Sequence, residues 1–242
     1  MTPNGKGLAV VTGASRGIGA AIARQLFEED HAVLAIARHF ETGALPDGVR
    51  KLSLDLDRPD SPAGIAAEVA RLEMPISVLV NNAAIQRPVD LTQPFDAQRR
   101  ADIEAELRLN LLVPIALTNA LLDRMQRPGG TIAMVTSLVA LHPKPSAPVY
   151  SASKAGLASF TASLRQQMRP LGLRVMELVP PVVETGMTEG RGGNKMRPEA
   201  LALAVAEGLA AGREVVAPGL SRKVRLLNRA APGVVAQVLA RH

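Results

Sequence analysis

The stretch TGASRGIG at residues 12–19 decides the fold of this chain. It follows a short apolar run, GLAVVTG at 7–13, and it leads into a segment with helical spacing at 18–30. Glycines in such a turn let the backbone bend sharply and approach a ligand closely, and the N-terminus of the next helix presents free N–H groups to a phosphate. The glycines are Gly13, Gly17 and Gly19. A Gly triplet between the first strand and the first helix predicts a dinucleotide site.

Apolar runs and helical segments alternate along the rest of the chain. We expect strands at residues 7–13, 31–38, 49–56, 76–83, 130–137, 173–180 and 213–218. We expect helices at residues 18–30, 61–73, 99–126, 149–169 and 197–212. The strands are continuously apolar rather than alternating, which is typical of a parallel sheet buried between two layers of helices. The pattern therefore predicts a doubly wound α/β fold.

No linker, repeat or shift in composition divides the sequence, so we expect a single domain over residues 1–242. One stretch stands apart, because TGMTEGRGGNKM at 185–196 is polar and rich in Gly. We expect a mobile loop there, and we interpret residues 185–212 as a substrate loop or lid segment within the domain.

The composition excludes several functional classes. The chain has 242 residues, one Tyr, no Trp and no Cys, which leaves few stacking residues for nucleic acid and no thiolate ligands for a metal. No run of about 18 apolar residues is present and no signal peptide precedes the first strand, so we expect a cytoplasmic protein without a membrane span. The net charge of +6 owes much to residues 221–242, which we interpret as a solvated terminal helix or a partner- or lipid-facing segment.

The end of the second expected strand bears on the choice of cofactor. Chains that bind NAD usually place an Asp or Glu there to bond the ribose 2′-hydroxyl, whereas this strand ends in Ala37 and Arg38. Arg38, together with Arg16 of the Gly-rich turn, could pair with a 2′-phosphate. The sequence therefore favours NADP(H).

The only tyrosine of the chain lies in VYSASKAGL at residues 149–157. Tyr150 and Lys154 are four residues apart, so they share one face of a helix. A nearby ammonium favours the phenolate and lowers the pKa of a Tyr, which suits it to proton transfer with a carbonyl or carbinol oxygen. Ser137 ends the fifth expected strand, where its hydroxyl could hold that oxygen.

Taken together, these motifs resemble the short-chain dehydrogenase/reductase family. The resemblance covers roughly residues 7 to 187 in the order that the family requires. Its motifs are TGASRGIG, Asp55 in LDLD, NNAA at 81–84, Asn110 in RLNLLVPIAL, Ser137, and Tyr150 with Lys154. The resemblance implies a Rossmann-type sheet of seven strands and a Ser–Tyr–Lys site. It also implies that the helices at 99–126 and 149–169 pack against their copies in a homodimer or homotetramer.

The resemblance assigns roles to individual residues. It implies that Asn110 kinks its helix and holds a water of a proton relay, that Asp55 faces the adenine, and that Lys154 also bonds the nicotinamide ribose. The implied catalytic residues are Asn110, Ser137, Tyr150 and Lys154. The implied cofactor-binding residues are Gly13, Ser15, Arg16, Gly17, Ile18, Gly19, Arg38, Asp55, Leu56, Asn82, Ala83, Ala84, Tyr150, Lys154, Pro180, Val183 and Thr185.

Two positions depart from the family pattern. Ala84 replaces the usual Gly, and Pro181 follows Pro180 where the family has Pro-Gly. Proline fixes φ and lacks an N–H, so the loop after the sixth strand is stiffer and loses any contact through that group. A DltE-like subset of the family shares the Pro-Pro pair and a basic C-terminal stretch.

The expected substrate side is mostly apolar, which suits a hydrophobic aldehyde or ketone. The residues we expect there are Val139, His142, Pro181 and Met187, and no metal site is expected. His142 could instead be an incidental loop residue, and Lys144, Arg87 or Arg191 could meet an anionic tail of the substrate. The leading hypothesis is an NADPH-dependent carbonyl reductase. The alternatives are an NADP-dependent alcohol dehydrogenase and a non-catalytic NADP(H)-binding sensor, and a sensor should have a broken active site.

Overall fold

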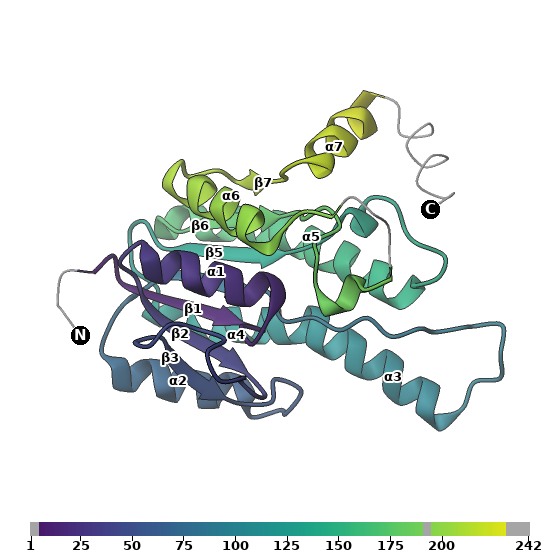
Figure 1. Cartoon of the computed structure of the whole chain (residues 1–242), viewed down its shortest axis with the longest axis horizontal. Helices are drawn as coiled ribbons and strands as arrows, with labels where there is room; N and C mark the ends of the chain where they lie inside the picture. Colours follow the sequence, from purple (N-terminus) through teal and green to yellow (C-terminus); the bar gives the residue numbers. More distant parts are fainter. Residues whose placement is uncertain (1–4, 191–194, 231–242) are drawn as a thin grey trace.

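The computed structural model describes residues 5–190 and 195–230, and its centre is a parallel sheet of seven strands (Figure 1). The strand order is β3-β2-β1-β4-β5-β6-β7. The strands are β1 Leu8–Thr12, β2 Ala32–Ala37, β3 Arg50–Ser53, β4 Ile76–Asn81, β5 Thr131–Val135, β6 Arg174–Leu178 and β7 Val215–Val216. Because the order reverses between β1 and β4, the carboxyl ends of these two strands open a crevice for a ligand.

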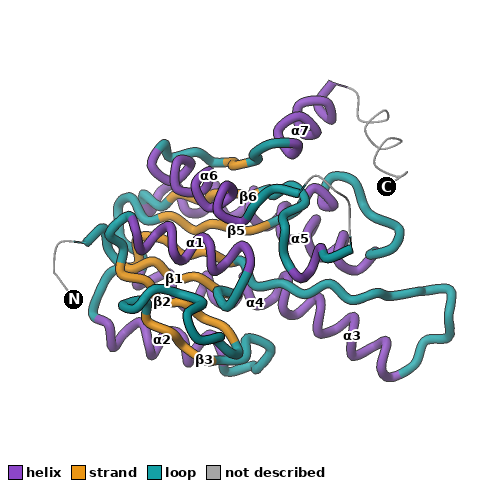
Figure 2. Tube along the Cα trace, in the orientation of Figure 1, coloured by secondary structure: helices purple, strands orange, loops and turns teal. Residues whose placement is uncertain are grey.

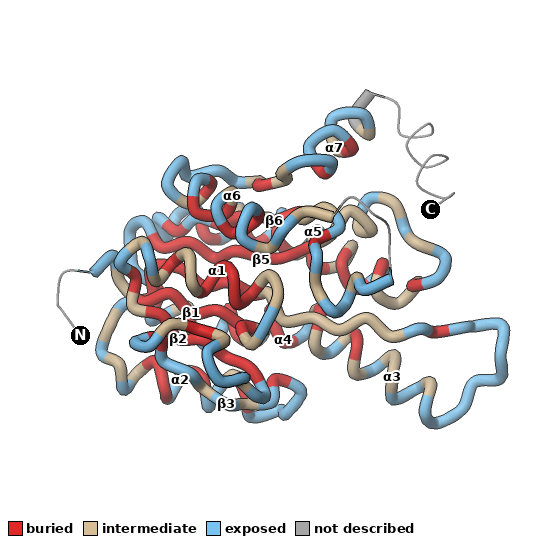
Figure 3. Tube along the Cα trace, in the orientation of Figure 1, coloured by how far each residue is buried: buried red, intermediate tan, exposed pale blue. Residues whose placement is uncertain are grey.

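Helices cover both faces of the sheet, as the continuous apolar strands predict (Figure 2). The helices are α1 Gly17–Glu28, α2 Ser61–Leu72, α3 Ala97–Leu107, α4 Val113–Leu121, α5 Pro148–Met168, α6 Pro198–Ala210 and α7 Leu220–Ala230. Successive residues of β1 point to opposite faces. Ala9 and Val11 pack with α1 and α6, whereas Leu8 and Val10 pack with α2, α4 and α5. The predicted doubly wound fold is confirmed, and its two cores appear as the red interior of Figure 3.

The expected long helix at 99–126 is present as one continuous helical segment, Ala97–Arg124, whose helix type changes along its length. It consists of α3, a π-helical turn at Arg108–Leu112, α4 and a 3-10 turn at Leu122–Arg124. Asn110 lies inside the π-helical turn, and its side chain hydrogen-bonds the backbone of a neighbouring loop. Single π-helical turns within α-helices are frequent at functional sites. The long helix thus changes pitch at the residue that the family pattern singles out.

The helices and strands in the later part of the chain lie where we expect them, but they are shorter. The strand expected at 213–218 is reduced to the two residues of β7. A 3-10 turn at Gly186–Thr188 starts the segment expected as a substrate loop, and α6 ends it. Residues 191–194 of that segment and residues 231–242 of the basic C-terminal stretch lie outside the described residues. The assignment of residues 1–242 to one domain therefore stays a prediction.

One stretch of the described chain, Ala97–Arg124, is long and apolar enough to cross a membrane by length and composition alone. Its most apolar window has a mean hydropathy of 1.3, and 39% of that window is buried. Val113, Leu117 and Leu121 of this stretch pack beneath the sheet. A core helix passes the same test, so the stretch is weak evidence for a membrane span.

Candidate active site

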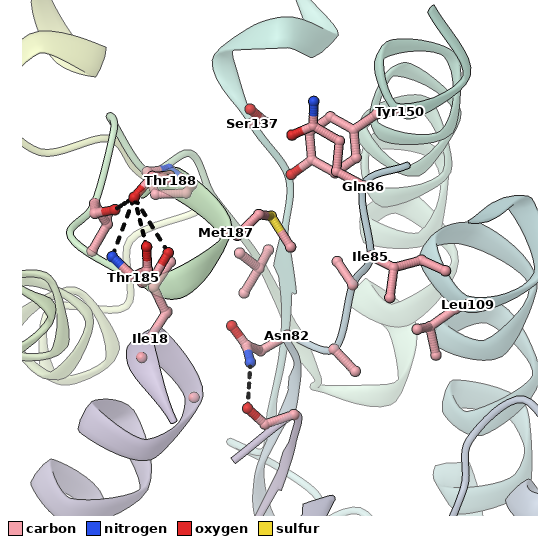
Figure 4. A pocket seen from close by; sticks show the side chains of 18 of the residues that line it. Ile18, Asn82, Ile85, Gln86, Leu109, Ser137, Tyr150, Thr185, Met187 and Thr188 are labelled. Atoms are coloured by element: carbon pink, nitrogen blue, oxygen red, sulfur yellow. Dashed lines mark hydrogen bonds between the residues drawn. The ribbon is translucent and has the colours of Figure 1, made fainter. Parts of the chain in front are cut away.

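A cavity of about 810 Å³ opens at the carboxyl ends of the central strands. In Figure 4 the turn that contains Thr185 and Thr188 lies across this cavity from Tyr150 and Gln86. The predicted site residues that line it are Gly13, Ser15, Arg16, Gly17, Ile18, Gly19, Arg38, Asp55, Leu56, Asn82, Ala83, Ala84, Ser137, Val139, Tyr150, Lys154, Pro180, Pro181, Val183, Thr185 and Met187. Asn110 and His142 are not among the lining residues. The fold thus brings most of the predicted site together from widely separated motifs.

The Gly-rich turn between β1 and α1 is held open by Asn82. Its side-chain amide donates to the carbonyl oxygens of Thr12 and Gly13, at 2.9 and 3.2 Å. The Thr12 hydroxyl in turn accepts the backbone N–H groups of Asn82 and Ala83. Gly13 has a φ of +66°, which an L side chain rarely adopts, and a Cβ there would meet the Ala83 backbone at 2.8 Å. The end of β4 therefore holds the Gly-rich turn in place.

Gly19 gives a direct test of this packing. A Cβ at Gly19 would lie 2.3 Å from the Gly13 carbonyl oxygen and 2.5 Å from the Asn82 amide nitrogen. Since the first neighbour is backbone, we expect Gly19→Ala to destabilise the fold by roughly 1–3 kcal/mol and to weaken cofactor binding. Thermal unfolding and a cofactor titration would measure the two effects.

Gly64→Ala is the matched control, because Gly64 also lies in a helix and its Cβ would meet only the end of the Leu54 side chain, at 3.3 Å. We expect that variant to be neutral or slightly more stable, since Ala favours a helix by up to about 1 kcal/mol over Gly. If Gly19→Ala has the same melting temperature and the same cofactor affinity as Gly64→Ala, neither stability nor cofactor binding requires the close packing of the turn.

Arg16 and Arg38 lie exposed at the edge of the cavity. Within the described part of the chain, neither guanidinium has a carboxylate within 4 Å, although many other arginines do. A Cβ at Gly186 would come within 3.7 Å of Arg16, so this arginine bridges the Gly-rich turn and the substrate loop. Two guanidiniums, one in the turn after β1 and one after β2, that have no carboxylate partner among the described residues suit a phosphate.

Tyr150 and Lys154 lie on the face of α5 that forms the cavity wall. Lys154 is only 2% exposed, and its Nζ donates to the Val135 carbonyl oxygen at 2.8 Å. The same nitrogen is 5.8 Å from the centre of the Tyr150 ring. Burial lowers the pKa of Lys154 to about 8. The ammonium is therefore the form that predominates at neutral pH, and it lies beside the phenol.

Ser137 directly follows β5 and begins a 3-10 turn at Leu138–Ala140. Its backbone is extended, with φ −164°, and its hydroxyl accepts the backbone N–H of Val139 at 3.3 Å. A strand end in an open α/β sheet faces the ligand crevice. The hydroxyl therefore lines the same cavity as the Tyr150 side chain (Figure 4).

Asn110 lies behind this site and fixes its wall. Its Oδ1 accepts the backbone N–H of Ile85 at 2.9 Å, and its Nδ2 donates to the Ile85 carbonyl at 2.8 Å and to the Ser153 hydroxyl at 3.2 Å. The Ser153 hydroxyl donates onward to the Tyr150 carbonyl at 2.8 Å. Asn110 thus connects the loop after β4 to the helix that carries Tyr150.

Comparison with known proteins places the chain in a family. A family model described as short chain dehydrogenase matches residues 7–195. The chain belongs to the short-chain dehydrogenase family. It is 35% identical to "Uncharacterized oxidoreductase DltE" of Bacillus subtilis over 74% of this chain and 73% of that protein. It is 33% identical to "3-oxoacyl-[acyl-carrier-protein] reductase FabG" of Vibrio cholerae over 78% of each chain.

Solved structures of short-chain dehydrogenases share this fold. A short-chain dehydrogenase from Burkholderia cenocepacia in complex with NADP matches 99% of each chain with a TM-score of 0.80 and 26% identity. An alcohol dehydrogenase from Thermococcus sibiricus, complexed with 5-hydroxy-NADP, matches 84% of this chain and 90% of that chain with a TM-score of 0.72 and 25% identity. The predicted membership of the short-chain dehydrogenases, with a DltE-like relative, is confirmed.

The cavity fits the nicotinamide cofactor that short-chain dehydrogenases use. Its volume lies within the usual range of cofactor sites, about 300–1,000 Å³. Gly17 has a φ of +57°, and a Cβ there would meet the Thr185 side chain at 2.9 Å, so the Gly-rich turn packs closely against the substrate loop beside the cavity. The residues that would hold the cofactor come from the Gly-rich turn, the ends of β2 to β4, and α5.

Sequence reasoning missed several residues of this short-chain dehydrogenase site. Thr188 caps the turn with Thr185, and Lys195 donates to the Thr188 carbonyl at 2.6 Å while lining the cavity. Leu109 lines the cavity from the π-helical turn. Glu106 is fully buried one turn before Asn110.

His142 is the predicted substrate residue that the cavity does not include. Its Nε2 is buried and has no hydrogen-bond partner among the residues that the structure describes. Lys144, two residues later, does line the cavity, and its backbone N–H donates to the Ser151 hydroxyl at 3.0 Å. The loop between Ser137 and Tyr150 therefore presents Lys144 to the cavity, as the sequence suggests, and not His142.

Proposed function

We propose that this short-chain dehydrogenase is an NADPH-dependent reductase that converts an aldehyde or ketone to an alcohol. The observation that carries the proposal is the convergence of Ser137, Tyr150 and Lys154 on one cavity with the Gly-rich turn. The cofactor choice rests on Arg16 and Arg38, which lie at the cavity edge without a carboxylate partner in the described chain. The NADP complexes of related structures support it.

The residues of the chain account for the proton side of this reaction. When bound, the nicotinamide supplies the hydride to the carbonyl carbon. The Ser137 hydroxyl hydrogen-bonds the carbonyl oxygen, and the Tyr150 hydroxyl donates the proton to it. The Lys154 ammonium stabilises the phenolate that remains, because an opposite charge nearby favours the ionised form. Asn110 holds the loop at Ile85 in register with α5, the helix that carries Tyr150 and Lys154.

The substrate proposal rests on the lining at the far side of the cavity. Ile85, Leu109, Leu138 and Met187 present apolar surface there. Arg87 and Lys144 line the same region and add positive charge. We infer a hydrophobic carbonyl compound, and an anionic group on its tail would meet these two cations. Relatives named as carbonyl reductases and a ketoacyl reductase are in line with this class.

An NADPH assay with a panel of aldehydes and ketones tests the proposed function. Consumption of NADPH with a hydrophobic carbonyl compound is the expected result. If the protein oxidises alcohols with NADP+ but reduces no carbonyl compound, the dehydrogenase direction is favoured instead. Binding of NADPH, seen by nicotinamide fluorescence, without turnover of any compound would favour a sensor and contradict the reductase.

We propose that the chain forms a homodimer or homotetramer. The α4 and α5 helices cover one sheet face, yet the structure leaves apolar surface on their outer side. Leu112, directly before α4, is 55% exposed, and only 39% of the most apolar 18-residue window within 97–124 is buried. Packing of these helices against a second copy would bury that surface.

Light scattering at micromolar concentration checks this assembly. We expect a mass that is a multiple of the 25.5 kDa chain. A charged substitution, Leu112→Glu, is expected to shift the protein toward the monomer, whereas Leu203→Glu on the exposed side of α6 is the matched control. A wild-type mass of 25.5 kDa would refute the proposal.

A further inference from the structure

Helix α7 is joined to the rest of the fold along one side only. On that side Ser221 is 0% exposed and Val224 is 6% exposed. Arg225 forms an ion pair with Glu177 of β6, at 3.5 Å. Figure 1 shows α7 projecting from the edge of the molecule beyond β7, and most of it is drawn as exposed in Figure 3. The helix therefore has a fixed attachment to the protein and a second side that faces outward.

The outward side of α7 carries three leucines. Leu220, Leu226 and Leu227 are 55%, 58% and 57% exposed. Leu220 and Leu227 are seven residues apart and share one face of the helix, and Leu226 lies beside them. A single exposed leucine is ordinary on a protein surface, but several on one short helix mark an interaction surface.

Basic side chains lie next to these leucines. Arg222 and Lys223 are both exposed. Arg222 precedes Leu226 by four residues and Lys223 precedes Leu227 by four, so each cation neighbours a leucine on the helix surface. The long stems of Arg and Lys pack along an apolar layer while their charged ends stay outside it. The outward side of α7 is therefore apolar and cationic at once.

This positive charge has few acidic neighbours. Within the described chain, neither Arg222 nor Lys223 has a carboxylate within 4 Å. The last 28 residues contain no Asp or Glu and supply five of the six net positive charges of the chain, from Arg222, Lys223, Arg225, Arg229 and Arg241. A second copy of α7 would bring like charges against these cations, whereas an anionic lipid surface complements them.

We propose that α7 binds the surface of a membrane that contains anionic lipids. The helix lies in the plane of that surface, its three exposed leucines enter the boundary between head groups and acyl chains, and the head groups attract Arg222 and Lys223. Association of this kind differs from spanning, since α7 has 11 residues and a helical span needs about 20. The inference goes beyond the proposed function and does not depend on it.

The start of α7 adjoins the substrate loop. A Cβ at Gly219, directly before α7, would lie 3.0 Å from the Met196 side chain. The backbone of Met196 bonds Val182 and Glu184, at 2.9 Å each, and Val182 lines the cavity. A membrane bound at α7 would therefore hold hydrophobic carbonyl compounds near the cavity, and only this consequence rests on the proposed function.

Flotation of the full-length protein with lipid vesicles tests the inference. We expect the protein to float with vesicles of equal parts phosphatidylglycerol and phosphatidylcholine, and far less with vesicles of phosphatidylcholine alone. Binding should weaken with salt, because the Debye length falls from about 10 Å at 0.1 M to about 3 Å at 1 M. A protein that does not bind the anionic vesicles at low salt overturns the inference.

A double substitution of leucines tests the apolar contribution. Leu226→Gln together with Leu227→Gln leaves the charge unchanged and should weaken binding to the anionic vesicles by at least about tenfold, since burial of each leucine contributes to the free energy of binding. Leu203→Gln is the matched control, because Leu203 is 52% exposed on α6 and should not meet the membrane. Wild-type affinity in the double variant contradicts the proposal.

A second pair of variants tests the cations. Arg222→Gln together with Lys223→Gln should weaken binding by about tenfold or more. Arg169→Gln together with Arg213→Gln removes the same charge from exposed residues after α5 and before β7, and it should have little effect. If both pairs weaken binding equally, the total charge and not α7 attracts the vesicles, and the inference fails.

The absence of cysteine from the sequence allows a direct probe of α7. A fluorophore sensitive to polarity, attached at Leu227→Cys, should shift to the blue when the anionic vesicles are added, and the same label at Leu203→Cys should not. A label at position 227 that is already shifted without lipid shows that other protein covers the leucine, which also overturns the inference. Loss of that shift on dilution would identify the cover as a second copy.

None of these measurements uses cofactor or substrate. A protein that binds the anionic vesicles but turns over no carbonyl compound would sink the proposed function and leave the role of α7 intact. A protein that reduces carbonyl compounds but ignores the vesicles would do the reverse.

Discussion

Tyr150→Phe is expected to lower the rate of carbonyl reduction by about 10²–10⁴-fold, which is the usual contribution of a positioned general acid. The substitution removes only the hydroxyl, and the ring keeps its place on α5 near the Lys154 ammonium. Folding and NADPH binding should therefore survive, while proton transfer to the carbonyl oxygen should not. Turnover measured beside an NADPH fluorescence titration separates the two effects. Near wild-type turnover in Tyr150→Phe would refute the assigned mechanism.

Lys154→Ala is the informative comparison for that result. It removes a fully buried ammonium that bonds the Val135 carbonyl, so it should lower turnover and also weaken NADPH binding. The tyrosine variant should show a defect in chemistry alone, and the lysine variant a defect in both chemistry and binding. A lysine variant with normal cofactor affinity would show that Lys154 does not hold the cofactor.

Arg38→Asp is expected to reverse the cofactor preference of the enzyme. Arg38 follows β2 at the cavity edge, and in the described chain it has no carboxylate within 4 Å that would occupy its guanidinium. An aspartate there repels a 2′-phosphate and can bond a 2′-hydroxyl. The loss of one charge-assisted hydrogen bond, about 3 kcal/mol, corresponds to roughly a 10²-fold change in the ratio of kcat/KM for NADPH and NADH.

The same charge change elsewhere controls for the altered net charge. Arg124 is exposed, lies just before β5 at the amino-terminal edge of the sheet, and is not among the cavity residues. Arg124→Asp should leave the cofactor preference unchanged. Equal use of NADPH and NADH by the wild type, or an unchanged ratio in Arg38→Asp, would show that Arg38 does not select the cofactor.

The sequence alone was sufficient for the sheet and for the position of the Gly-rich turn between its first strand and first helix. Continuous apolar runs predict buried parallel strands because both faces of such a sheet are covered, and all seven strands form where the runs lie. The Gly-rich turn could be located without a structure, because the spacing of its glycines only suits a sharp turn from strand to helix. Tyr150 and Lys154 could be paired because helical periodicity is local.

Only the tertiary structure showed the contact behind the change of helix type between α3 and α4. The resemblance to the family implied a kink at Asn110, and the structure shows that its side chain bonds Ile85, which lies 25 residues earlier, at the turn where the helix changes pitch. Helix propensity is a local property, so it does not reveal a contact between distant residues. The cavity likewise excludes His142 and includes Lys195, because loop conformation depends on what packs beneath it rather than on residue type.

The environment of Glu106 shows the same limit most clearly. In the sequence it is one acidic residue among several in a helix that also contains Asp102 and Glu104. Glu104 faces solvent and pairs with Arg100, while Glu106 is buried and accepts the backbone N–H of Arg87, which lies 19 residues earlier. Residue spacing determines which side chains share a helix face. The burial of a carboxyl group, and the partner that it meets, depend on how α3 packs against the loop after β4, which is a property of the tertiary structure.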